Sequence, residues 1–284
     1  ERGLLTDQLR GRVLDAETLP ALEDVYLPHR PKRRTRGMVA RERGLEPLAK
    51  VLLAQTGQRI DVASFVDRDR DVEDQDAALA GACDIIAEDI SEDSEVRRDL
   101  RRLFAERALL VSTVIKKKQA EAAKFRDYFD WSEPLSRAPS HRILAVLRGS
   151  TEGFLRVQAR PDEGDALLRL SRRYLRGHGF ATEQVRLATE DAYKRLLLPS
   201  LEREALKGAK SRADEAAIRI FVTNLRELLM AAPFQNKRML AIDPGFRTGC
   251  KVVALDAQGA LLHNTTVFPT LGQGQSEEAA RSLR

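Results

Sequence analysis

One stretch limits the possible folds and functions of this chain more than any other, namely Leu240-Ala-Ile-Asp-Pro-Gly-Phe-Arg-Thr-Gly-Cys-Lys-Val-Val253. An apolar strand ends in a single carboxylate, Asp243, and a Pro-Gly turn and a second apolar run follow it. The glycines Gly245 and Gly249 allow the backbone to turn sharply and to pass close to a ligand. A carboxylate at the end of a buried strand can be held toward a metal ion or a phosphate. The alternative is an ordinary hairpin in which the Asp caps a turn.

This order of residues resembles the first hairpin of an RNase H-like fold, in the D-P-G-x-R-x-G form of RuvC-type resolvases and YqgF-type domains. Arg247, Thr248 and Gly249 complete the form, and two strands flank it in register. The resemblance implies that Asp243 stands at the position of the first metal ligand. It also implies that Arg247 contributes to nucleic-acid binding.

Composition indicates a soluble, helix-rich protein of the cytoplasm. The 284 residues suffice for about two domains, and 32% of them are charged while only 5% are aromatic. The sequence has no apolar run near the roughly 18 residues that span a membrane and no signal peptide, so we expect no membrane partner. Cys83 and Cys250 are isolated, and the four histidines are scattered, so we expect no disulfide framework and no metal site built on them. We expect His141 and His178 to be structural.

The net charge of +5 conceals two blocks of opposite sign. Residues 28–43 carry seven Arg or Lys and one Glu, whereas residues 66–95 carry twelve Asp or Glu and two Arg. The basic block predicts either a phosphate-binding surface, because Arg makes bidentate contacts with phosphates, or a loop that clamps helices through Arg-carboxylate pairs. Both interpretations stay open for its cations, which are Arg30, Lys32, Arg33, Arg34, Arg36, Arg41 and Arg43.

Helical periodicity dominates residues 1–236. We predict short helices capped by Thr6 and Thr18, a helix-turn-helix corner at 40–45 that serves packing, adjoining helices near 73–90 and 92–108, and a long helix over 214–231. The buried stripe predicted for the helix at 73–90 consists of Ala78, Ala82, Ile85, Ile86 and Ile90. One β-hairpin is predicted within this region at about 142–158, because two short apolar runs, 142–147 and 153–158, flank a Gly-bounded loop. The predicted fold class is mainly α. A multi-helix N-terminal region with one inserted β-hairpin precedes the first strands of an α/β RNase H-like domain, at 240–242, 250–255 and 260–268.

Several further blocks together resemble the bacterial Tex transcription accessory proteins. The resemblance runs from the first helix to the last residue and implies a Tex-like helical region over 1–236 and a YqgF-type domain that starts at 237. Because the chain begins with Glu1 and stops inside a helical pattern, we expect a fragment. It would lack most of the YqgF-type domain and the helix-hairpin-helix and OB-fold domains that follow in the family. The blocks are Leu22-Glu-Asp-Val-Tyr-Leu-Pro-His-Arg-Pro-Lys-Arg-Arg-Thr-Arg36, Gly44-Leu-Glu-Pro-Leu48, Lys124-Phe-Arg-Asp-Tyr-Phe129, Ser140-His-Arg142 and the D-P-G-F-R-T-G block.

The resemblance implies a nucleic-acid-binding transcription accessory factor, with RNA or DNA and the transcription machinery as partners. Much of the binding would belong to the OB-fold domain, so this chain would act mainly as a scaffold. The alternative function is a metal-dependent nuclease or junction resolvase of the RNase H-like class. An actin-like ATPase is a third class, although its hairpin usually has Gly directly after Asp, where this chain has Pro244.

Asp243 is the candidate catalytic residue. Hydrolysis with two metal ions needs several carboxylates around ions roughly 3.5–4 Å apart. The hairpin offers one carboxylate at this position, and any partners would lie on later strands and helices. We therefore expect no cofactor in this chain, with Mg²⁺ at Asp243 only if the complete domain is catalytic, and no activity of the chain by itself.

Overall fold

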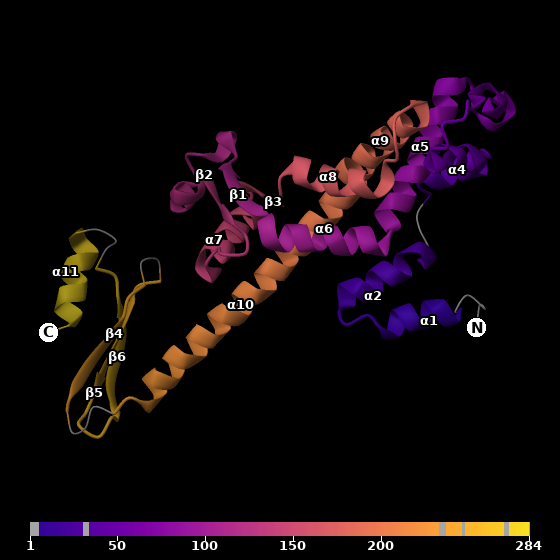
Figure 1. Cartoon of the computed structure of the whole chain (residues 1–284). Helices are drawn as coiled ribbons and strands as arrows, with labels where there is room; N and C mark the ends of the chain where they lie inside the picture. Colours follow the sequence, from indigo (N-terminus) through magenta and orange to yellow (C-terminus); the bar gives the residue numbers. More distant parts are fainter. Residues whose placement is uncertain (1–5, 31–33, 233–236, 246–247, 270–272, 284) are drawn as a thin grey trace. The chain divides into compact units, whose positions relative to one another are not determined.

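The computed structural model describes residues 6–30, 34–232, 237–245, 248–269 and 273–283 (Figure 1). The chain divides into two compact units, residues 1–219 and 220–284. The mainly α fold predicted from the sequence is confirmed. In the described part of the chain, no helix is long and apolar enough to cross a membrane. The helices of the first unit are α1 (Asp7–Leu14), α2 (Leu19–Tyr26), α3 (Arg36–Glu42), α4 (Glu46–Ala54), α5 (Gln75–Glu92), α6 (Ser94–Arg107), α7 (Ser140–Thr151), α8 (Glu163–Tyr174) and α9 (Phe180–Asp191), and α10 (Leu198–Met230) crosses into the second unit.

Side-chain caps explain where several of these helices begin. The predicted caps Thr6 and Thr18 are confirmed, since each hydroxyl accepts a hydrogen bond from the backbone N–H three residues later. Thr35, Asp74 and Asp162 act in the same way at α3, α5 and α8. Each cap satisfies one of the backbone N–H groups that the first turn of a helix leaves without a partner.

The core of the first unit forms around α5. The apolar stripe predicted for this helix is confirmed, since Ala78, Ala82, Ile85, Ile86 and Ile90 are all buried. Helices α3, α4 and α9 pack against it. The corner between α3 and α4 was predicted to serve packing, and its residues do lie in this core. They are Ala40, Leu45, Leu48 and Leu52.

An antiparallel sheet is inserted among the helices, but it is not the predicted hairpin. Its strands β1 (Leu109–Val114), β2 (Asp130–Pro134) and β3 (Leu155–Arg160) have the order β2-β1-β3. The prediction of a strand at 142–147 is wrong, because these residues belong to α7. The prediction at 153–158 is correct in type, since most of these residues form β3, which pairs with β1.

The spacing of buried residues explains why 142–147 is helical. Ile143, Val146 and Gly149 are buried at intervals of three residues, which places them on one face of a helix. A strand would have turned Ile143 and Val146 to opposite faces of the sheet. The backbone of β3 therefore finds its hydrogen-bonding partner far away in sequence, at β1.

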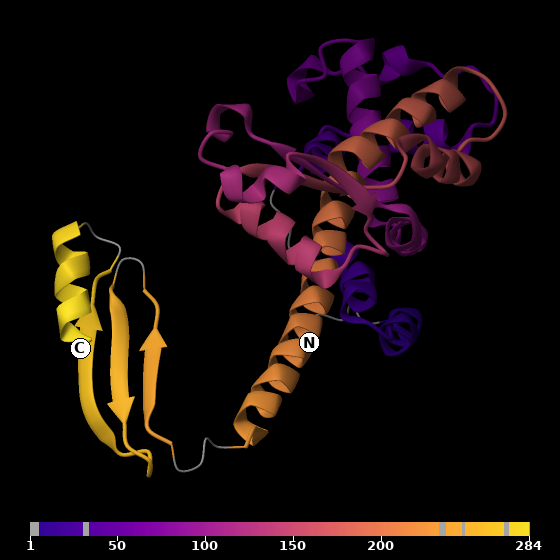
Figure 2. The same ribbon diagram turned by 90° about the vertical axis from the view of Figure 1, so that its left-hand side faces the viewer.

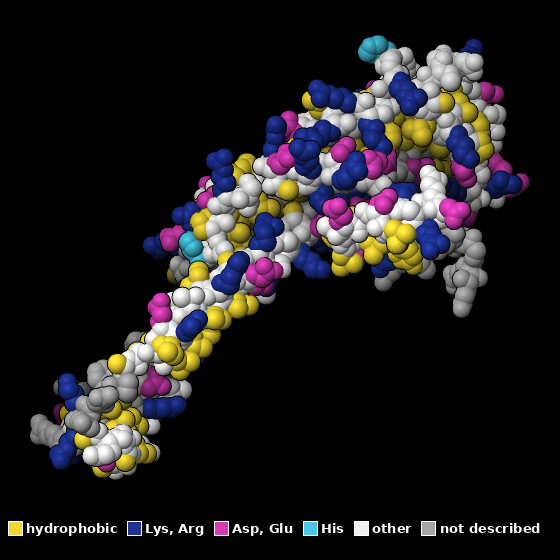
Figure 3. Space-filling view, turned by 60° about the horizontal axis from the view of Figure 1, so that its bottom comes forward, with side chains coloured by type: hydrophobic (Ala, Val, Ile, Leu, Met, Phe, Trp, Pro, Cys, Tyr) yellow, Lys and Arg dark blue, Asp and Glu magenta, His cyan; other side chains and the backbone are white. Residues whose placement is uncertain are grey.

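A helical backbone runs without interruption from α9 through a π-helical segment (Ala192–Leu197) into α10. The predicted long helix is thus present and begins earlier than expected. Pro199 is the second residue of α10, shortly after the π segment, and the backbone there stays helical. The last turns of α10 expose many apolar side chains (Figure 3), namely Ile218, Ile220, Phe221, Val222, Leu225, Leu228, Leu229 and Met230.

The second unit holds the three strands predicted from the D-P-G block and the runs after it. They are β4 (Met239–Asp243), β5 (Cys250–Leu255) and β6 (Leu261–Val267), and they form an antiparallel sheet in this order. Helix α11 (Gln273–Ser282) lies beside β6 (Figure 2). A small apolar cluster of Val252, Val267 and Ala279 joins the helix to the sheet.

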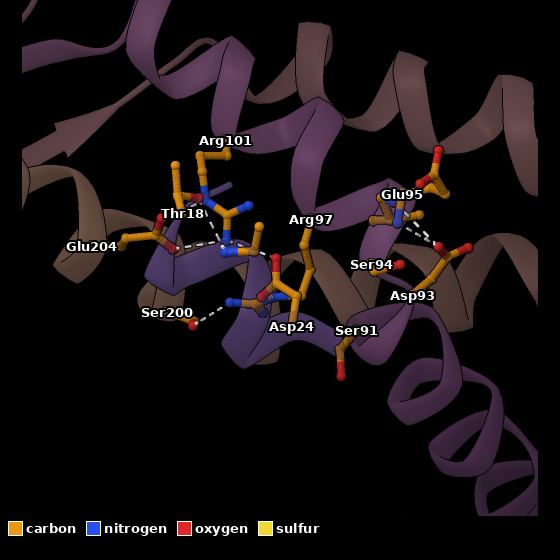
Figure 4. Close-up of polar contacts among 12 residues, drawn as sticks. Thr18, Asp24, Ser91, Asp93, Ser94, Glu95, Arg97, Arg101, Ser200 and Glu204 are labelled. Carbon is orange, nitrogen blue, oxygen red and sulfur yellow. Dashed lines mark hydrogen bonds and ion pairs between the residues drawn. The ribbon is translucent and has the colours of Figure 1, made fainter. Parts of the chain in front are cut away.

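Buried charges join α2 to α6 and α10 (Figure 4). The carboxylate of Asp24, of which 6% of the side chain is exposed, accepts hydrogen bonds from Arg97 Nε at 2.5 Å and Arg101 Nη2 at 2.8 Å. Arg97 also donates to Ser200 at 3.1 Å, and Arg101 pairs with Glu204 on α10. Asp24 and Glu204 together balance the charges of the two arginines, and these contacts join α2, α6 and α10.

Asp93 is a second junction, between α5, α6 and α8. One of its oxygens caps α6 by accepting from the N–H groups of Glu95 and Val96, and the other accepts from Tyr174 at 2.8 Å and from Arg173. Burial opposes the ionisation of Asp93, but these hydrogen bonds and the charge of Arg173 outweigh it, so its pKa is lowered.

Replacement of Asp24 by Asn should lower the free energy of unfolding by about 3–5 kcal/mol, because it leaves the buried Arg97 without a counter-charge. Urea unfolding followed by circular dichroism measures the change. Glu106→Gln is the matched control, since it breaks the exposed Arg102–Glu106 pair and should leave the unfolding midpoint nearly unchanged. Equal midpoints for the two variants would contradict this role of Asp24.

Asp93→Asn should destabilise the chain at pH 7 and much less at pH 3. A carboxylate with a lowered folded pKa stabilises above its unfolded pKa, and this contribution is lost as the pH falls below about 4. Asn keeps the helix cap, so the difference in unfolding free energy between the unmodified chain and the variant isolates the charge. Asp162→Asn is the matched control for a helix cap, since the carboxylate of Asp162 accepts no hydrogen bond from a Tyr or Arg side chain among the described residues. A difference for Asp93→Asn that is equal at both pH values would refute the expectation.

Candidate nucleic-acid interface

The loop that follows Asp243 is closely packed, as the glycines in the sequence predict. Gly249 has a φ of +80°, and a Cβ at this position would lie 2.6 Å from the ring of Phe268 and 2.7 Å from Thr266. A Cβ on Gly245 would lie 2.5 Å from the carbonyl oxygen of Gly249. Neither position accepts a side chain without a shift of the backbone or its neighbours, so the hairpin requires glycine at both.

Asp243 is exposed at the end of β4, opposite Lys251 of β5. Asp256, the next carboxylate in sequence, lies at the other end of β5, where its Oδ1 accepts from the N–H groups of Gln258 and Ala260. Among the described residues no group of three or more His, Cys, Asp or Glu side chains could hold a metal ion. The residues present therefore offer one ligand, Asp243, and do not fit a two-metal site. Arg247 lies outside the described residues.

One arginine of the basic block, the half-buried Arg41, clamps α3 to α5, and the other described cations of the block take no part in this clamp. Arg41 donates to Glu88 at 2.6 Å and to Asp89 at 2.5 Å, and Thr35 donates to the other oxygen of Glu88 at 2.8 Å. A Cβ on Gly37 would lie 2.3 Å from Glu88 Oε2, so this glycine lets α3 approach the carboxylate. Burial opposes the charge of Arg41, but its hydrogen bond to Glu88 and the two negative charges raise its pKa. These contacts support the clamp interpretation for Arg41.

The other described cations of the block are exposed, apart from the half-buried Arg43, and the structure does not bring them all to one point. Arg34 pairs with Glu42 at 2.7 Å, and Arg43 lies 3.5 Å from Asp71. Arg36 is exposed at the start of α3, and Arg30 is exposed as well. Lys32 and Arg33 lie outside the described residues.

A second group of exposed cations was not singled out from the sequence. Arg172 and Arg176, at the end of α8 and just after it, are exposed, and so is His178, which was predicted to be structural. A local count of charge could have found them, because residues 166–182 contain four Arg and no Asp or Glu.

Comparison with known proteins agrees with this architecture. A sequence family described as Tex central region-like matches residues 57–221, more than half of the chain. The chain belongs to the Tex family. A second family, described as the Tex protein YqgF-like domain, matches residues 237–284.

Relatives in bacteria and in human align with almost the whole chain. Protein tex of Bordetella pertussis is 39% identical over 299 residues, which covers 100% of this chain and 38% of that protein. The transcriptional accessory protein Tex of Neisseria gonorrhoeae is 39% identical over 278 residues, covering 94% and 36%. The human S1 RNA-binding domain-containing protein 1 is 27% identical over 299 residues, covering 98% and 29%. The chain thus spans little more than a third of the length of these bacterial relatives.

Arg41→Ala should lower the free energy of unfolding by roughly 2–3 kcal/mol, because it leaves Glu88 buried without its arginine. Arg34→Ala removes the same charge from an exposed pair and should change stability by less than about 0.5 kcal/mol. Thermal unfolding of both variants gives the comparison. A destabilisation by Arg34→Ala as large as that by Arg41→Ala would show that burial of Glu88 does not decide the effect.

Proposed function

We propose that this chain is part of a nucleic-acid-binding transcription accessory factor and acts in it mainly as a scaffold. The observation that carries the proposal is the match to the Tex family in both units, the central region over 57–221 and the YqgF-like domain over 237–284. Relatives are named as a transcriptional accessory protein and as an RNA-binding protein with an S1 domain. Their names support RNA or DNA as the ligand and the transcription machinery as the wider partner.

Ion pairs and continuous helices support the scaffold role. Asp24, Asp93 and Glu88 each join helices that are distant in sequence. Such buried or half-buried junctions hold helices in one arrangement, because a shift would leave a charge unpaired. A body of this kind can hold other binding domains in fixed positions.

Binding measurements test the proposal. Fluorescence anisotropy with labelled single-stranded RNA, single-stranded DNA and duplex DNA should show binding by the full-length Bordetella pertussis relative and weaker binding by this chain. The scaffold role predicts this order, because the chain spans 38% of that relative. Equal affinities would refute the scaffold role, and no binding by either protein would refute the nucleic-acid function.

A metal-dependent nuclease or junction resolvase is the second candidate, and the position of Asp243 at the end of β4 favours it. Bound metal ions would activate a water molecule and neutralise phosphate charge, and Asp243 would be one of their ligands. A single exposed carboxylate holds Mg²⁺ weakly, since this ion gives up its waters reluctantly. The geometry of the described residues therefore favours the scaffold over the nuclease.

The chain should not cleave single strands, duplexes or branched junctions with Mg²⁺ or Mn²⁺, and should not hydrolyse ATP. The reason is that one carboxylate cannot position two ions and a water on a phosphodiester. Gel analysis of labelled substrates and a phosphate-release assay give the result. Asp243→Ala is the control, and cleavage by the unmodified chain that this variant loses would establish the nuclease function.

A further inference from the structure

The sequence around the end of α8 is strongly cationic. Residues 166–182 hold four Arg and one His without any Asp or Glu. Arg173 pairs with Asp93, whereas Arg172 and Arg176 are exposed and form no ion pair with the described residues. His178 is exposed beside them in sequence. The charges of Arg172 and Arg176 are therefore not balanced by an ion pair with the described residues.

Stabilisation of the helix dipole explains only part of this concentration. Arg172 and Arg173 lie in the last turn of α8, where cations are favourable. Arg176 and His178 lie beyond the helix. Arg59, another exposed arginine without an ion pair among the described residues, belongs to a separate loop after α4. The helix dipole does not account for Arg176 or Arg59, whereas an anionic ligand would account for both.

The loop after α8 is held in a defined conformation. The side chain of Gln55 donates to the carbonyl oxygen of Tyr174 at 2.7 Å and accepts from the N–H of Arg176 at 2.8 Å. Thr182 donates to the carbonyl oxygen of Arg176 at 3.2 Å. Both backbone polar groups of Arg176 are thus tied, and the contact with Gln55 brings the loop after α4 beside the loop after α8.

A groove lies between the loop after α4 and the start of α9. It has a volume of about 770 Å³ and is lined by residues 58–63, Gln75 and Phe180. Phe180 begins α9 and is 52% exposed. Arg59 is the basic residue of the lining and Asp61 the acidic one. An exposed ring and an arginine in the lining of one groove are the kinds of group that single-stranded nucleic acids use, the ring for stacking of a base and the arginine for a phosphate.

We propose that the loops after α4 and α8 form a binding site for single-stranded nucleic acid. Arg59, Arg172 and Arg176 would contact phosphates, and Phe180 would stack on a base. The inference rests on the proposed nucleic-acid function and locates part of it in the helical body. A single strand fits better than a duplex, because a base in a duplex is already stacked and cannot reach the ring.

The experiment compares variants of the chain by anisotropy with labelled single-stranded RNA and DNA over a range of salt concentrations. The double variant Arg172→Ala/Arg176→Ala should bind roughly 10-fold more weakly or worse and flatten the salt dependence of log K by about 1.4. Phe180→Ala should weaken binding by about 5- to 100-fold with an unchanged salt slope, because stacking carries no charge.

Arg137→Ala/Arg156→Ala is the matched control. Both of these arginines are exposed and form no ion pair with the described residues, so this variant loses the same charge at a different place. It should bind as the unmodified chain does. Circular dichroism of all variants should show the same helix content, because every replaced side chain is exposed.

Several results would overturn the inference. Equal weakening by the control would show that only net charge matters, and unchanged binding by all variants would place the site elsewhere. Displacement of the RNA by poly-glutamate at the same charge concentration, with Phe180→Ala unaffected, would indicate a site for acidic peptides. If the full-length Bordetella pertussis relative binds and this chain does not, the inference fails while the proposed function stands. If neither binds, both fail.

Discussion

Small side chains on α5 allow other helices to approach it closely, and the packing of α3, α4 and α9 in the core of the first unit depends on this close approach. A Cβ on Gly81 would lie 2.3 Å from Leu45 Cδ1, so α4 could not keep its position against a larger residue. The same helix carries Asp84 and Glu88 beside its apolar stripe. Close apolar packing therefore brings Asp84 within reach of Arg195 and Glu88 within reach of Arg41, and ion pairs form at both places. The acidic residues of 66–95 thus act in part as counter-charges within the fold.

Local periodicity was sufficient where the buried side of an element shows within a few residues. The stripe of α5 and the strands β4 to β6 were predicted for this reason. The prediction of a strand at 142–147 was wrong because a run of five apolar residues fits a helix or a strand equally well. Whether such a run becomes a helix or a strand depends on the elements that pack or pair with it, which lie far away in sequence. β3 pairs with β1, whose strand character was not predicted, and this leaves α7 free to be a helix.

The roles of individual arginines could not be predicted for a similar reason. A count of charge identifies the basic block, but it does not distinguish Arg41, which pairs with a buried glutamate, from Arg34, whose partner is exposed. The difference arises only when Gly37 brings α3 against α5. Conversely, the stretch 166–182 has fewer cations than the basic block, yet the structure leaves Arg172 and Arg176 without ion pairs among the described residues.

Cations that are already paired inside the fold contribute little to the field that a ligand meets, because their carboxylates cancel them at short range. The unpaired arginines therefore matter more than the net charge of +5. A site with a few phosphate contacts and one aromatic ring binds weakly by itself and is sensitive to salt. Such a site contributes most when it is linked to a second binding domain. When a second binding domain holds the same strand, the weak site meets it at a high effective concentration, so a modest surface on a rigid body can direct the path of the strand.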